Sequence, residues 1–388
     1  GGYVIEGRGL FDGTSGFLSR ASISDATSTA IFYAHFVIKR SELGTQQDLL
    51  SQASTINDGS RIYINSSNQL VYWKKQNSTG VQVNAVSTEI LRDPSAFYVI
   101  DIAHDSTQST VGNAIKMWIN GVPLTVTGTY VGNPIHWFGR SGDLLRIGKD
   151  EFNSSYLDSY VSRAFLNLGT LYSPTNFGEV TNDGFWQINE VEDITYTATG
   201  LLIEGGTAMV AGTDSSGNSN SFTKSGTITA TNDSPTDGGD NDEYGDYATL
   251  DPLVALGNVI ASTTLSNGNL TTTTSSASGH GFNLSTIPVS GGKYYCEITC
   301  VTKTASNMNF GAVDLTSNDL YTDSNSYVGS MQFSYGYTAN ATKISNNATQ
   351  ESYGNAASYG TGDVIGIALD LDNGAIWFSK NDAWIDGN

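Results

Sequence analysis

The chain has 388 residues and a formal net charge of −20, because 38 acidic residues outnumber 18 lysines and arginines. This balance argues against a nucleic-acid-binding surface, which needs a basic stripe, and against docking on anionic lipid. No apolar run reaches the roughly 18–20 residues of a membrane-spanning helix, so we expect no membrane insertion. The length leaves room for two or three domains.

The first half of the chain consists of short runs in which apolar residues alternate with polar ones. The clearest runs are residues 30–40, 61–75, 96–105 and 114–126. Turn signals such as Asn120-Gly121 separate them. Period-two alternation predicts strands, and no stretch shows the pattern of an amphipathic helix of three turns. We therefore predict an antiparallel β-sandwich over residues 1–228.

Two segments of this half suit ligand binding. The first is residues 129–143, the candidate glycan-binding loop, which combines aromatic rings with groups that can bond sugar hydroxyls: Tyr130, His136, Trp137, Arg140 and Asp143. The alternative is a loop whose aromatic side chains only cover a sheet edge. The second segment is residues 70–76, where alternation turns Tyr72 and Trp73 to opposite faces, so at most one of them faces the core.

Acid-rich loops in the same region could hold Ca²⁺. Asp143, Asp150 and Asp158 are the candidate ligands. Their spacing does not follow the fixed pattern of an EF-hand loop, so this prediction rests on composition alone. We expect no other cofactor.

No catalytic constellation is evident in the sequence. The chain has four histidines, and it lacks a G-x-S-x-G nucleophile elbow, a P-loop and a dinucleotide-binding fingerprint. Glu190 and Glu192 come nearest to the paired carboxylates of a retaining glycosidase, which lie roughly 5–5.5 Å apart. They lack a third acid and lie outside the expected strand core. We therefore expect no enzymatic activity.

The composition changes at residues 229–246, which are acidic, glycine-rich and nearly free of aliphatic side chains. Such a composition predicts a linker. Alternating runs resume after it, so residues 247–388 should form a second β-sandwich. Cys296 and Cys300 lie four positions apart in one of these runs. They would be about 13 Å apart along a strand, too far for a disulfide, so both should be buried free thiols.

Two parts of the chain resemble known families. The region from Tyr98 onward, with a hairpin at residues 118–121 and the Ile147-Gly148 pair, resembles laminin-G-like, concanavalin-A-type domains, some of which bind Ca²⁺. Residues 362–388 resemble a SPRY domain, another β-sandwich: a Gly-Asp pair precedes a strand, an acidic turn follows at residues 370–374, and an aromatic strand then leads to Lys-Asn. A SPRY domain usually continues further, so we expect this second domain to be incomplete at its C-terminal end.

The connecting segments 212–222 and 232–253 are similar to joints in tail-fibre-like and other virion-surface proteins of marine phages. This resemblance implies an extracellular adhesive module of a virion appendage or capsid fibre, which binds host-surface glycan or only projects from the particle. It implies other virion proteins as partners and a homo-oligomer, with a trimer favoured. The alternatives are a purely structural decoration protein without a ligand and a secreted glycan-degrading enzyme.

The expected fold class is therefore all-β, with two antiparallel, jelly-roll-like β-sandwich domains joined by an acidic, glycine-rich linker. The residues that we expect to bind a ligand lie in loops and on strand faces of the first domain, because sheets hold such loops rigid.

Overall fold

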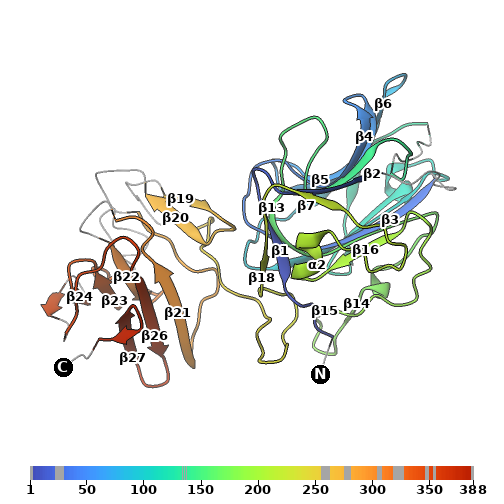
Figure 1. Cartoon of the computed structure of the whole chain (residues 1–388). Coiled ribbons are helices and arrows are strands. Elements are labelled where there is room, and N and C mark those ends of the chain that lie inside the picture. The colour runs from blue at the N-terminus through green and yellow to red at the C-terminus, as the bar shows by residue number, and fades with distance from the viewer. Residues whose placement is uncertain are drawn as a thin grey trace. The chain divides into compact units, whose positions relative to one another are not determined.

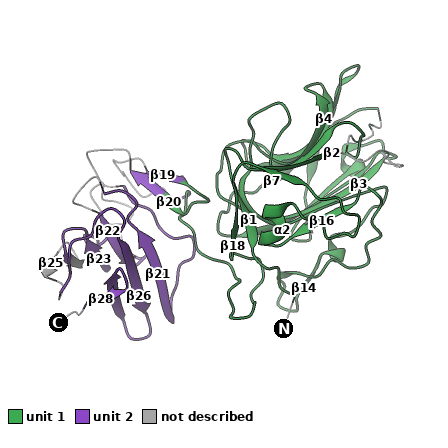
Figure 2. Cartoon of the chain, viewed as in Figure 1, with its two compact units in different colours: residues 1–252, 266–271 green, residues 253–265, 272–388 purple. Residues whose placement is uncertain are grey.

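The computed structural model of the chain describes residues 3–21, 30–132, 134, 136, 138–254, 263–274, 281–303, 308–317, 327–345, 349–352 and 355–385. Its regular structure is nearly all β-strand, which confirms the all-β prediction. The chain divides into two compact units (Figure 2): unit 1 comprises residues 1–252 and 266–271, and unit 2 comprises residues 253–265 and 272–388. In the described residues the helices are short turns, and none is long and apolar enough to cross a membrane.

Two eight-stranded antiparallel sheets form most of unit 1 (Figure 1). Sheet A contains, in spatial order, β10 (Val122–Pro123), β9 (Ile115–Ile119), β8 (Phe97–Asp105), β3 (Ile31–Arg40), β13 (Asp158–Leu168), β1 (Arg8–Asp12) and β18 (Ile228–Thr231), with β16 (Leu201–Glu204) also paired to β13. Sheet B contains β11 (Val126–Tyr130), β7 (Gly80–Ile90), β6 (Gln69–Gln76), β5 (Asp58–Ile64), β4 (Gln47–Thr55), β12 (Leu144–Ile147), β2 (Phe17–Ala21) and β17 (Thr223–Ser225). The smaller elements are β14 (Gly178–Val180), β15 (Trp186–Ile188), α1 (Val111–Ala114), α2 (Gly206–Ala211) and the 3₁₀ turn η1 (Pro174–Asn176).

The core of unit 1 lies between the two sheets and follows from the alternation along each strand. In sheet B, one buried cross-strand row consists of Ile147, Leu50, Ile62, Tyr72 and Ala85. Sheet A contributes side chains such as Phe32 and Phe36 to the same cluster. Each large apolar side chain buried in this way stabilises the fold by about 1.5–3 kcal/mol. The alternation that predicts the strands therefore also selects the core residues.

The outer face of sheet A, which points away from this core, is covered by two segments. The first, residues 172–196, places Phe177 on the face, where its ring stacks on His35 at a centroid distance of 4.1 Å. His35 is fully buried, and its Nδ1 lies 2.8 Å from Asp101 Oδ1. The Tyr33 hydroxyl donates to the same oxygen at 2.9 Å. This polar cluster is closed off from solvent and belongs to the packing of sheet A.

The second covering segment is the acidic stretch 229–246, which we expected to be a linker. Instead it begins in β18 and continues across unit 1. Asp233 is buried there, and Lys39 Nζ lies 3.1 Å from its Oδ2 and 2.8 Å from Asp246 Oδ1. Arg8 Nε donates to the backbone oxygen of Asp233 at 2.6 Å, and its guanidinium pairs with the Asp233 carboxylate. Residues 229–246 therefore pack on unit 1, which differs from the linker prediction. Their carboxylates compensate Arg8 and Lys39, two cations that would be costly to bury alone.

Unit 2 contains two four-stranded antiparallel sheets. One consists of β21 (Lys293–Thr299), β26 (Val364–Asp370), β27 (Ala375–Lys380) and β28 (Ala383–Trp384), and the other of β22 (Asn309–Val313), β23 (Ser334–Thr338), β24 (Thr342–Ser345) and β25 (Thr349–Ser352). A cluster that includes Tyr337, Ile367 and Phe378 draws side chains from both sheets. Cys296 and Cys300 are both free thiols, as expected, but only Cys300 is buried, because Cys296 lies on the edge strand β21 and is exposed. A separate hairpin consists of β19 (Thr263–Ser266) and β20 (Thr271–Thr274).

Candidate functional site

The outer face of sheet B carries aromatic and polar side chains in register. Successive residues of a strand point to opposite faces, so the residues beside the buried row of sheet B point outward. One outward row crosses five strands and consists of Arg146, Ser51, Arg61, Trp73 and Asn84. Tyr63, two residues further along β5 than Arg61, shares this side. We refer to these six residues as the sheet B face.

Arg61 is held firmly at the centre of the sheet B face. Its Nε and Nη2 donate to the two carboxylate oxygens of Asp48, each at 2.9 Å. Its Nη1 lies 3.2 Å from Asp150 Oδ2, and Asn153 Nδ2 donates to that same oxygen at 2.5 Å. Two-point pairing with a carboxylate fixes the plane of a guanidinium group. The loop after β12 thus fixes the orientation of Arg61 together with β4.

Two aromatic rings flank this guanidinium. Arg61 Cζ lies 4.9 Å from the ring centre of Tyr63 and 5.8 Å from that of Trp73. Both aromatic residues are half-buried, whereas Tyr72 is fully buried in the core. The expectation that at most one of Tyr72 and Trp73 faces the core agrees with this arrangement. An accessible ring beside fixed hydrogen-bonding groups can recognise a sugar ring and its hydroxyls.

The sequence pattern singled out Trp73 but missed its neighbours. Arg61 and Tyr63 are two positions apart in one alternating run, and Trp73 lies in the next run, after a turn. This pattern was the signal that could have placed all three side chains on one face. Asp48 was harder to place, because the register of β4 against β5 shifts between Asp48 and Leu50. Burial raises the pKa of Asp48 to about 6, and the Arg61 guanidinium opposes this shift.

The structure separates the members of the candidate glycan-binding loop. His136 is buried, and its Nε2 lies 3.0 Å from a backbone carbonyl of β3. Tyr130 is half-buried and packs against the core. Arg140 is exposed, with its Nε 3.6 Å from Asp143 Oδ2. Trp137 lies outside the described residues. Of the four described side chains, Arg140 offers the most accessible polar group, while His136 could reach a surface ligand only after rearrangement.

The three candidate calcium ligands lie in separate surroundings. Asp143 lies beside Arg140, Asp150 pairs with Arg61, and Asp158 begins β13 in the other sheet. Burial, reinforced by a nearby acidic side chain, raises the pKa of Asp158 to about 6. In the part of the chain that the structure describes, no three His, Cys, Asp or Glu side chains form a group suited to a metal ion.

The two carboxylates compared with a glycosidase pair lie outside the sheets of unit 1. Glu190 and Glu192 are exposed in the segment that follows β15, outside any strand. His104 is buried in unit 1, and burial lowers its pKa to about 3, so it stays neutral at physiological pH.

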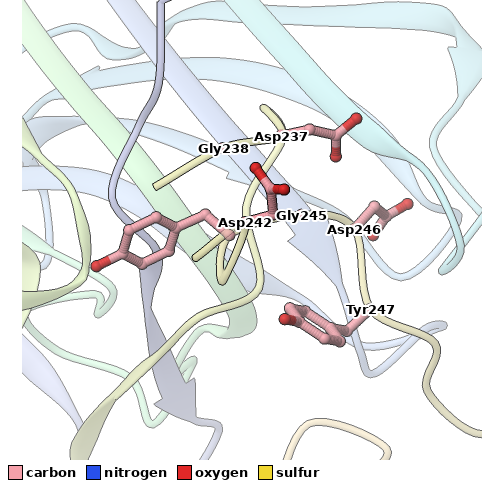
Figure 3. A pocket seen from close by; sticks show the side chains of 7 residues that line it. Asp237, Gly238, Asp242, Gly245, Asp246 and Tyr247 are labelled. Carbon is pink, nitrogen blue, oxygen red and sulfur yellow. The ribbon is translucent and has the colours of Figure 1, made fainter. Parts of the chain in front are cut away.

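A hollow of about 400 Å³ lies in the acidic segment of unit 1 (Figure 3). It is lined by Asp237, Gly238, Asp242, Tyr244, Gly245, Asp246 and Tyr247. Asp246 already pairs with Lys39. Acidic side chains alone do not identify a ligand, so we assign none to this hollow.

Comparison with known families gives a match in unit 2. Residues 293–386 match the SPRY domain family, which confirms the resemblance in unit 2. No curated protein matches the sequence. The laminin-G resemblance and the virion setting stay predictions.

Several solved structures share parts of the β architecture. They include a heptameric SAP-like pentraxin from Limulus polyphemus, with 11% identity, a TM-score of 0.36, and coverage of 53% of this chain and 97% of that chain. The CBM40 of the Ruminococcus gnavus IT-sialidase, bound to α2,3 sialyllactose, has 10% identity, a TM-score of 0.29, and coverage of 40% and 92%. The binding domain of botulinum neurotoxin DC, in complex with rat synaptotagmin II, has 16% identity, a TM-score of 0.29, and coverage of 41% and 40%. These TM-scores are too low to carry a functional argument.

Proposed function

We propose that unit 1 is a non-enzymatic glycan-binding module whose ligand lies on the sheet B face. The observation that carries this proposal is the pair of half-buried rings, Trp73 and Tyr63, beside a guanidinium that two carboxylates hold in place. The C–H face of a pyranose can stack on such rings, while Arg61 and Asn84 bond its hydroxyls. Sheet A is less suited, because residues 172–196 and the acidic segment cover its outer face.

Trp73→Ala tests the proposal directly. An aromatic stack contributes about 0.5–1.5 kcal/mol beyond its buried area, so its loss should weaken binding about two- to tenfold. A glycan array with the full chain would identify the best ligand, and titration with that glycan would compare the variants. Phe185→Ala is the matched control, because it removes a ring that is 72% exposed outside the sheet B face. Equal affinity of wild type and Trp73→Ala would contradict this assignment.

The candidate glycan-binding loop is the second possible contact surface of unit 1. The exposed Arg140 beside Asp143 favours it. Arg140→Ala and Trp137→Ala in the same titration would show whether the loop contributes. A chain that binds no glycan on the array would instead support the structural decoration protein. Release of reducing sugar from a bound polysaccharide would support the glycan-degrading enzyme.

The same proposal places the chain at the surface of a virion, where it would adhere to host-surface glycan and contact other virion proteins. Its support is the similarity of segments 212–222 and 232–253 to joints in phage appendage proteins. Single sugar contacts are weak, and linked copies raise avidity by roughly 10²–10⁴ when the geometry allows. A closed trimer would supply such copies. Light scattering of the purified chain that gives the mass of one copy would contradict the trimer.

A further inference from the structure

Unit 2 carries an aromatic surface on the sheet of β21, β26, β27 and β28. Ile365, Ile367 and Phe378 on this sheet point into the core of the unit, so the residues that alternate with them point outward. The register gives two outward rows, Tyr295–Ala368–Trp377 and Glu297–Gly366–Ser379–Trp384. We refer to these seven residues as the unit 2 aromatic face.

The aromatic residues of this face are accessible. Tyr295, Trp377 and Trp384 are 53%, 45% and 49% exposed. Only the small residues Gly366 and Ala368 stand between them on β26. Isolated exposed apolar side chains are common on proteins, but three large rings on one sheet face indicate a contact surface.

Tyr295 lies across the sheet instead of projecting from it. A Cβ atom at Gly366, on the neighbouring strand, would come within 2.7 Å of Tyr295 Oη and 3.1 Å of its Cε2. The Tyr295 hydroxyl donates to Glu297 Oε1 at 2.8 Å. Its ring centre lies 6.0 Å from that of Trp384. The ring is therefore oriented by its surroundings, which reduces the entropy lost when a ligand binds.

The charges on this face favour an uncharged ligand. Lys293 lies two positions before Tyr295 on β21. Its Nζ is 3.1 Å from Asp370 Oδ2, so this carboxylate compensates its charge. Glu297 is the charged residue of the two rows, and the whole chain carries a charge of −20. This charge repels anionic ligands, while a carboxylate readily accepts hydrogen bonds from hydroxyl groups. The rows also lack long aliphatic side chains, so rings separated by glycine and alanine form a shallow platform.

We propose that the unit 2 aromatic face binds a neutral polysaccharide, whose pyranose rings stack on Tyr295, Trp377 and Trp384. The Glu297 carboxylate lies in the second row beside these rings and would accept hydrogen bonds from its hydroxyl groups. This site is separate from the sheet B face, and neither needs the other. The chain would then contact glycan through both of its units.

Affinity electrophoresis of the full chain tests this inference. The gels would contain a soluble β-glucan or a galactomannan as neutral probes, and alginate as an anionic comparison. We expect at least one neutral probe to retard the wild-type chain and alginate not to do so. Trp377→Ala and Trp384→Ala should each weaken that retardation at least threefold, while Trp377→Phe should retain most of it. Tyr294→Ala is the matched control, because Tyr294 is 47% exposed on the opposite side of β21.

The possible outcomes separate this site from the proposed function of unit 1. Loss of retardation in Trp73→Ala but not in Trp377→Ala or Trp384→Ala would overturn the unit 2 site and leave the sheet B face standing. The reverse result would support the unit 2 site alone. A wild-type chain that neither neutral probe retards would overturn the inference, as would an equal effect of Tyr294→Ala. Unchanged thermal unfolding of each variant would show that binding, and not folding, had been altered.

Discussion

At Asp48, two effects act in opposite directions on one carboxyl group. Burial disfavours its ionised form, and the two-point contact with Arg61 favours it. Burial is the larger effect and raises the pKa to about 6 from its ordinary value of 3.8. Between pH 4 and 6 the unfolded chain is ionised at this position, whereas the folded chain keeps its proton. This group therefore lowers the free energy of unfolding as the pH rises through that window.

We expect Asp48→Asn to remove this part of the pH dependence. A pKa shift of about two units corresponds to about 3 kcal/mol. The free energy of unfolding of the variant, relative to that of wild type, should therefore be about 1–3 kcal/mol higher at pH 7 than at pH 4.5. Urea unfolding of both proteins at the two pH values gives the comparison. Buried histidines such as His104, whose pKa is lowered, act in the opposite direction in both proteins and cancel in the difference. A difference that does not vary with pH would show that Asp48 titrates normally.

The acidic segment shows how an element can be fixed by charge instead of apolar packing. Asp233 serves both Arg8 and Lys39, and all three side chains are buried. Removing one partner of a buried ion pair costs about 3–5 kcal/mol, because the remaining charge is left without compensation. We expect Asp233→Ala to destabilise unit 1 by that amount and to speed proteolysis within residues 234–249.

A matched variant separates this effect from a general loss of negative charge. Asp240 lies in the same segment but is exposed, so Asp240→Ala should leave both the free energy of unfolding and the proteolysis rate nearly unchanged. If both variants are cleaved at the wild-type rate, the ion pairs do not hold the segment in place.

The elements also show which features the sequence could predict. Alternation predicted the strands and separated Tyr72 from Trp73, because the period of a strand is a local property. The acidic segment was misread as a linker, because its composition lacks aliphatic side chains and Lys39 lies 194 residues away from Asp233. The contact between Asp48 and Arg61 depends on the register of β4 against β5, which shifts between Asp48 and Leu50. Local periodicity could therefore be predicted from the sequence, whereas the pairing of distant residues could not.

At the scale of the whole molecule, the two units differ in the cores that stabilise them. The main cluster of unit 1 draws on both eight-stranded sheets, whereas the main cluster of unit 2 is much smaller in the described residues. Stability grows with the apolar area removed from water. We therefore expect two transitions in calorimetry, with unit 2 unfolding at the lower temperature.

Two matched core substitutions assign these transitions. Phe36 in unit 1 and Phe378 in unit 2 are each 1% exposed, and replacing a buried phenylalanine with alanine costs about 3–5 kcal/mol. Phe378→Ala should lower only the first transition and Phe36→Ala only the second, because each cavity weakens the packing of its own unit. If either variant moves both transitions together, the two units unfold as one cooperative body. The apolar core of unit 1 would then stabilise unit 2 as well, and the fold of the SPRY-matching region would depend on the rest of the chain.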